Sequence, residues 1–233
     1  MPMRVIERPS PNFDERPTAP DMLVLHYTGM KTAEEALARL CDPAARVSAH
    51  YTIDRDGTVY AHVPEDRRAW HAGVSYWAGE TNVNARSIGI ELVNPGHEFG
   101  YEPFPVSQIE SLIDLASGIL KRHAIRPARV LGHSDVAPAR KTDPGELFPW
   151  AQLADYGIGL WPAWSAKALR LPVETALAEI GYGVSPHVDV PLETVIAAFQ
   201  RRFVPKAITG SADPETARRI AAVHAAVCAP VVR

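Results

Sequence analysis

Three side chains at the ends of predicted elements are of the types that bind a metal ion. His26 closes the apolar run MLVLH at 22–26, and His133 closes the run ARVLGH at 128–133. Asp143 follows His133 by ten residues, in a segment that prolines make stiff. Two imidazoles and one carboxylate suit Zn2+, which keeps a fourth tetrahedral position for water and lowers the pKa of that water to about 7. The alternative is that both histidines are structural residues at buried strand ends.

Two charged side chains add to this set. Glu91 lies within the apolar run SIGIELV at 87–93. A carboxylate buried there needs a hydrogen bond, a cation or a chemical function, and Arg86 is the simplest partner nearby in the sequence. Lys141 lies two residues before Asp143. It either balances negative charge at the same site or is a solvated surface lysine.

Hydrophobic patterning predicts an α/β scaffold for these residues. Short apolar runs are typical of buried strands, and Asp56-Gly57 is typical of a hairpin turn. Thr32 and Glu35 have the spacing of a capping box at the start of a helix. The predicted elements are strands at 22–27, 87–93 and 128–133, a hairpin at 48–63, and helices at 32–42 and 107–122. Mixed strands and helices of this kind predict one domain built on a central sheet.

The chain divides into four predicted parts. Residues 1–20 hold five prolines and are expected to form an irregular arm. The α/β domain spans 21–155, and 156–165 are expected to be a linker. Residues 166–233 contain only helical patterns, which predict a small all-α domain of three helices that would fold alone only marginally.

Composition excludes several classes of function. The 233-residue chain has a net charge of −3, which argues against binding to nucleic acid or to anionic lipid. No apolar run approaches the ~18 residues that would indicate an integral membrane segment. The N-terminal residues lack the apolar run of a signal peptide. We therefore expect a cytoplasmic protein, with the periplasm or release by a holin as alternatives, and we expect a monomer.

Five blocks of sequence resemble, in the same order, the zinc-dependent N-acetylmuramoyl-L-alanine amidases of the AmpD/AmiD type. They are LVLHYTG, SAHYTIDRDGTVY, WHAG, SIGIELVNPG and LGHSDVAPARKTDPGELFPW. The resemblance covers about residues 20–155. It implies a central mixed β-sheet flanked by helices. It also implies hydrolysis of the amide between the lactyl group of N-acetylmuramic acid and L-alanine, in peptidoglycan or in anhydro-muropeptides.

The resemblance also implies roles for single residues. One Zn2+ per chain would be held by His26, His133 and Asp143. Glu91 would be the catalytic acid and base, and Lys141 would stabilise the oxyanion.

Substrate contacts and the C-terminal helices are further implications of the resemblance. Trp70 and His71 would line the substrate groove, and Arg86 would bind a carboxylate of the stem peptide. The helices of 166–233 are similar to a three-helix peptidoglycan-binding module. The alternative function is a non-catalytic peptidoglycan recognition protein of the same fold, and a missing metal ligand would indicate it.

Overall fold

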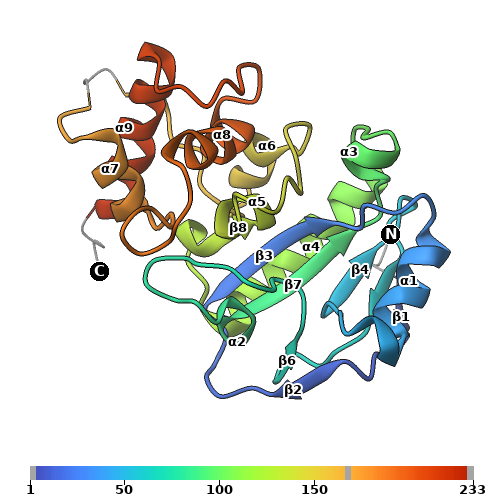
Figure 1. Ribbon diagram of the computed structural model, residues 1–233. Coiled ribbons are helices and arrows are strands. Elements are labelled where there is room, and N and C mark those ends of the chain that lie inside the picture. The colour runs from blue at the N-terminus through green and yellow to red at the C-terminus, as the bar shows by residue number, and fades with distance from the viewer. Residues whose placement is uncertain (1–3, 166–168, 230–233) are drawn as a thin grey trace.

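A mixed sheet forms the centre of the molecule (Figure 1). Within the described residues, 4–165 and 169–229, the computed structural model contains one six-stranded and one two-stranded sheet. The larger sheet has the order β1 (Val5–Glu7), β5 (Val59–Ala61), β4 (Tyr51–Ile53), β7 (Ser87–Leu92), β3 (Met22–Tyr27) and β8 (Val130–Gly132). The smaller sheet pairs β2 (Phe13–Glu15) with β6 (Arg67–Ala69). The hairpin strands β4 and β5 are antiparallel, whereas β3 is parallel to both of its neighbours.

The apolar strand β3 is buried because helices cover both faces of the sheet. Leu23 and Leu25 pack with apolar residues of α4 (Val106–His123), which lies behind the sheet in Figure 1. Met22 and Val24 point to the opposite face and pack against the C-terminal helices. Because both faces of β3 are covered, its side chains do not alternate between apolar and polar, and its sequence is a continuous apolar run.

One longer and four short helices complete the described part of the chain up to residue 165. Thr32 caps α1 (Ala33–Cys41) as predicted, because its side chain accepts a hydrogen bond from the Glu35 amide at 3.2 Å. The short helices are α2 (Val83–Arg86), α3 (Gly96–Phe99), α5 (His133–Val136) and α6 (Trp150–Ala154), with 3₁₀ turns at Pro43–Ala45 and Pro127–Arg129. In the described part of the chain, no helix combines the length and apolar character needed to cross a membrane.

The N-terminal arm was expected to be irregular, but it contains two short strands. Its described part, from residue 4 onward, contributes β1 to the edge of the large sheet and β2 to the small one. The prolines of this arm lie outside both strands, so none of them removes a hydrogen bond from either ladder. Proline content therefore marks the ends of these strands and does not exclude them.

The C-terminal helices share their apolar cluster with the sheet. They are α7 (Val173–Ile180), α8 (Leu192–Phe203) and α9 (Pro214–Cys228). Leu177, Phe199 and Ile220 belong to the same buried cluster as Met22 and Val24. The mixed sheet, its flanking helices and the additional C-terminal helices confirm the predicted fold class. The boundary proposed at 166 falls in the undescribed residues 166–168, and the chain end at 230–233 also lies outside the described residues.

A buried polar contact joins these helices to the sheet domain. Arg202 of α8 donates to Asp135 of α5 at 2.8 Å, and the Tyr182 hydroxyl donates to the same carboxylate at 2.6 Å. The Arg202 guanidinium also lies 3.9 Å from the centre of the Trp150 ring. Asp135, Tyr182 and Arg202 are all buried. Because Asp135 lies two residues after His133, this contact supports the turn that carries one of the candidate ligands.

Candidate active site

Strand register brings His26 and Glu91 together. The two residues are direct partners in the parallel pair of β3 and β7, so their side chains project side by side from the same face. β8 pairs with the other edge of β3, and its last residue, Gly132, lies opposite Leu25. His133 follows at once as the first residue of α5. The carboxyl ends of neighbouring parallel strands therefore place these residues at one edge of the sheet.

The loop after α5 returns Asp143 to the same place. The Ser134 amide donates to the Asp143 carbonyl oxygen at 2.8 Å, which fixes the end of the loop beside its beginning. Gly132 permits this close return, because a Cβ there would lie 2.8 Å from Cδ of Pro144. The ten residues from His133 to Asp143 thus form a loop whose two ends lie side by side.

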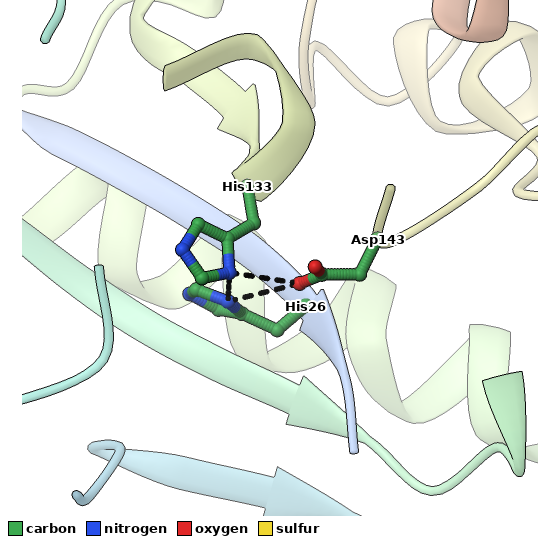
Figure 2. Close-up of side chains that lie close together, drawn as sticks. All are labelled: His26, His133 and Asp143. Carbon is green, nitrogen blue, oxygen red and sulfur yellow. Dashed lines mark hydrogen bonds and ion pairs between the residues drawn. The ribbon is translucent and has the colours of Figure 1, made fainter. Parts of the chain in front are cut away.

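The three predicted ligands converge on one point (Figure 2). His26 Nδ1 lies 2.9 Å from His133 Nδ1, and Asp143 Oδ2 lies 3.2 Å and 3.0 Å from these two atoms. All three side chains are buried. Figure 2 shows that they come from three separate segments, with the dashed contacts closing a triangle.

Hydrogen bonds on the far side of each ring decide which nitrogen faces this triangle. His133 Nε2 lies 3.1 Å from the Ala72 carbonyl oxygen, which can only accept, so Nε2 carries a proton and Nδ1 is the ring nitrogen left to bind a metal ion. His26 Nε2 lies 3.0 Å from His71 Nδ1. Burial, and next the neighbouring His133, lower the pKa of His26 to about 4, so this imidazole is neutral at pH 7.

The convergence fits a divalent cation. Burial would raise the pKa of Asp143, but its interactions with His133 and His26 outweigh burial and lower it, so this carboxylate is ionised. With His26 neutral and Asp143 ionised, the triangle brings together electron pairs of Nδ1 and Oδ2 that repel one another. A cation between them relieves this repulsion, and two imidazole nitrogens with one carboxylate oxygen are ligands that Zn2+ accepts. The group of His26, His133 and Asp143 can therefore bind a metal ion.

Glu91 is positioned for proton transfer. Burial, and next the charge of Asp143, raise its pKa well above the usual range for glutamate, while the charge of Lys141 opposes the increase. Its Oε2 atom is buried and has no hydrogen-bond partner among the described residues. An oxygen without an internal partner at the wall of a pocket is free to accept a proton from a bound molecule.

Arg86 does not join this site, either as the partner of Glu91 or as a pocket residue. It is the last residue of α2, at the opposite end of β7 from Glu91, roughly 16 Å away at the rise of an extended strand. Its guanidinium forms ion pairs with Asp21 and Glu80. Among the described residues that line the pocket, Arg86 is absent. Sequence proximity to Glu91 was misleading, because the four residues between Arg86 and Glu91 run along the extended strand β7.

A cavity of about 450 Å³ opens above the triangle. Its wall includes the predicted residues Glu91, Lys141, Trp70 and His71, together with His133 and Asp143. The Trp70 indole donates to Asp14 at 2.7 Å, which fixes its ring at the rim. A cavity of this volume is large enough for a small ligand, and acidic and basic groups are among its wall residues.

Several wall residues with polar side chains were not predicted from the sequence. Tyr27, Arg39 and His97 line the cavity, and the Tyr27 hydroxyl contacts His97 Nδ1 and Thr142 Oγ1, each at 2.9 Å. Tyr27 directly follows His26, so its position at the strand end was an available signal. Arg39 and His97 lie in elements that only the folded chain brings to the cavity.

Comparisons with known proteins agree with this geometry. Residues 16–146 match the family Amidase_2, described as N-acetylmuramoyl-L-alanine amidase. The chain is 42% identical to N-acetylmuramoyl-L-alanine amidase AmiD of Escherichia coli K12, over 84% of this chain and 79% of that protein. It is 39% identical to the 1,6-anhydro-N-acetylmuramyl-L-alanine amidase AmpD of the same organism, over 62% of this chain and 87% of that one.

A solved structure shows the same likeness in three dimensions. It is a complex of the E. coli AmiD amidase with the substrate anhydro-N-acetylmuramic acid-L-Ala-D-gamma-Glu-L-Lys. The TM-score is 0.77 at 38% sequence identity, covering 88% of this chain and 89% of that chain. From the matched family, the sequence identity and the shared fold, the chain belongs to the N-acetylmuramoyl-L-alanine amidase family, Amidase_2.

Proposed function

We propose that this protein is a zinc-dependent amidase that hydrolyses the bond between the lactyl carbonyl of N-acetylmuramic acid and the amino group of L-alanine. The observation that carries the proposal is the convergence of His26, His133 and Asp143 beside the unpartnered carboxylate of Glu91. Membership of the amidase family, and the muropeptide named as substrate of the AmiD relative, support the choice of bond.

In this proposal one zinc ion per chain is held by His26 Nδ1, His133 Nδ1 and Asp143 Oδ2. When bound, zinc supplies Lewis-acid polarisation and a water molecule of lowered pKa. Glu91 removes a proton from the attacking water as the new carbon–oxygen bond forms. It then delivers that proton to the alanine nitrogen as the carbon–nitrogen bond breaks. The positive charge of Lys141 balances the oxyanion that forms between these steps.

Replacing Lys141 by alanine is expected to keep zinc bound and to lower turnover by about 10²–10³-fold. It should also move the acid limb of the pH–rate profile to higher pH. The charge of Lys141 lowers the pKa of Glu91, so its removal raises that pKa and the base becomes ionised only at higher pH. Zinc content and kcat/KM against pH would be measured on the purified variant. Lys121→Ala, which removes the same charge from the exposed surface of α4, is the matched control.

The reaction is tested by its products. Zinc-loaded protein incubated with intact sacculi and with soluble anhydro-muropeptides should release peptides with a free L-alanine amino terminus and no new reducing sugar. Mass spectrometry distinguishes these products. Cleavage of the glycosidic bond, or binding of muropeptides without any cleavage, would contradict the proposal. The second result would favour the recognition-protein alternative, although all five positions of metal ligands, base and lysine carry suitable residues.

The C-terminal helices are proposed to add affinity for polymeric wall. This role rests on the likeness of 166–233 to peptidoglycan-binding modules and stays a prediction. The comparison of sacculi with soluble muropeptides above also addresses it, because such a module would favour the polymer.

A further inference from the structure

Residues 71 and 72 lie behind both candidate histidine ligands. His71 Nδ1 lies 3.0 Å from His26 Nε2, and the Ala72 carbonyl oxygen lies 3.1 Å from His133 Nε2. The other nitrogen of His71, Nε2, lies 3.1 Å from the Ser87 hydroxyl oxygen. A single short segment therefore contacts the outer nitrogen of each ligand ring.

The direction of the hydrogen bonds can be worked out from Ser87. Its hydroxyl lies 2.6 Å from the Val83 carbonyl oxygen, which can only accept, so the one hydroxyl proton is donated there. The Ser87 oxygen must then accept from His71 Nε2. A neutral His71 that donates from Nε2 accepts at Nδ1, so His26 donates from Nε2. The outcome is a lone pair on His26 Nδ1, the atom that faces the triangle.

The position of His71 is built into the fold. Its ring lies over Gly89, where a Cβ would come within 2.5 Å of the ring carbon Cγ. Ser87 and Gly89 lie on the same face of β7 as Glu91, at alternate positions. The Asn84 side-chain oxygen accepts from the amides of His71 and Ala72 at 3.1 Å and 2.8 Å. Small residues under the ring and a fixed backbone hold the ring in place.

We propose that His71 is a positioning residue for the metal site, acting through His26, and that the Ala72 carbonyl does the same for His133. The inference rests on the proposed function, since it concerns the same zinc ligands. The chain from Val83 through Ser87 and His71 to His26 fixes one tautomer and one ring orientation. Outer partners of this kind are typically worth 10–100-fold in metal affinity. His71 was expected to line the substrate groove. It does line the cavity, and both of its ring nitrogens also contact other groups of the protein.

The test measures the zinc affinity of the purified protein by competition with a chromogenic chelator, without substrate. His71→Ala is expected to weaken zinc binding by about 10–100-fold. His71→Asn places an amide oxygen near the position of Nδ1 and should restore affinity close to that of the parent. His71→Gln places its amide near Nε2, so it should bind zinc as weakly as His71→Ala. His62→Asn is the matched control, because the buried His62 ring contacts Arg8, Cys41 and Thr52 and none of the three candidate ligands.

The outcomes separate this inference from the proposed function. If the parent binds zinc tightly and all three His71 variants bind it equally well, His71 has no positioning role and the proposed function stands. If the parent binds no zinc, both proposals fail. Should His71→Ala not fold, the Asn and Gln variants decide. If only His71→Asn restores zinc affinity, the result supports the positioning role of His71. If His71→Asn and His71→Gln weaken zinc binding equally, His71 is only a packing residue and the proposal is overturned.

Discussion

Replacing Glu91 by alanine is expected to leave zinc bound and to lower turnover by roughly 10²–10⁴-fold, the usual contribution of a general acid–base group. Glu91 pairs in register with His26, and its Oε2 atom has no protein partner among the described residues. It is therefore placed to reach the attacking water. Zinc content and kcat for a soluble muropeptide, measured on the same preparation, give the result.

Glu91→Gln is the matched control, because it keeps the shape of the side chain and removes its basicity. It should be as inactive as Glu91→Ala. The parent should lose activity as pH falls through the pKa of Glu91, since only the ionised form accepts a proton. Burial raises that pKa, so this acid limb is expected above the ordinary range of glutamate. A metal-free Glu91→Ala protein would instead identify Glu91 as a ligand or a support of the ligands.

Replacing Asp143 by alanine is expected to remove zinc and activity together. The carboxylate supplies the negative charge of the triangle, and Oδ2 lies within 3.2 Å of both histidine nitrogens. Loss of a direct ligand should weaken zinc binding by more than the roughly 10–100-fold expected for an outer partner. Zinc affinity and turnover would be measured at the same protein concentration.

The control for this variant is Asp114→Ala, which removes an exposed carboxylate from α4 and should change neither property. The contrast with Glu91→Ala distinguishes a metal ligand from a proton-transfer group. Asp143→Ala should lose metal and activity, whereas Glu91→Ala should lose activity alone. An Asp143→Ala protein that retains zinc at parental affinity would show that Asp143 is not a ligand.

Much of the scaffold was predictable because apolar runs report burial directly. β3, β7 and β8 are short and mostly buried, so their positions follow from apolar runs in the sequence. His26 is the last residue but one of β3 and His133 directly follows β8, and the carboxyl ends of parallel strands meet at one edge. Their proximity therefore follows from the fold class once the strands are recognised.

Other features depended on contacts that no local pattern reports. The register that pairs His26 with Glu91 is a property of two strands far apart in sequence. β1 and β2 are only three residues long and lie between prolines, so their pairing partners define them more than their own residues do. His71 looks like a groove residue in WHAG. Its contacts with His26 and Ser87 are visible only when three segments come together.

The buried contact of Asp135 with Arg202 and Tyr182 links ligand binding at the triangle to the folding of the C-terminal helices. Asp135 holds the turn that begins at His133, and its partners belong to the C-terminal part of the chain. Any ligand that binds the folded form alone adds to the free energy of unfolding of everything that unfolds with it. Binding of the proposed metal at the triangle and folding of α7–α9 would then be linked reciprocally. The metal would stabilise these helices, and loosening the helices would weaken metal binding. A substitution far from the cavity would in this way alter the affinity of the triangle for the proposed metal.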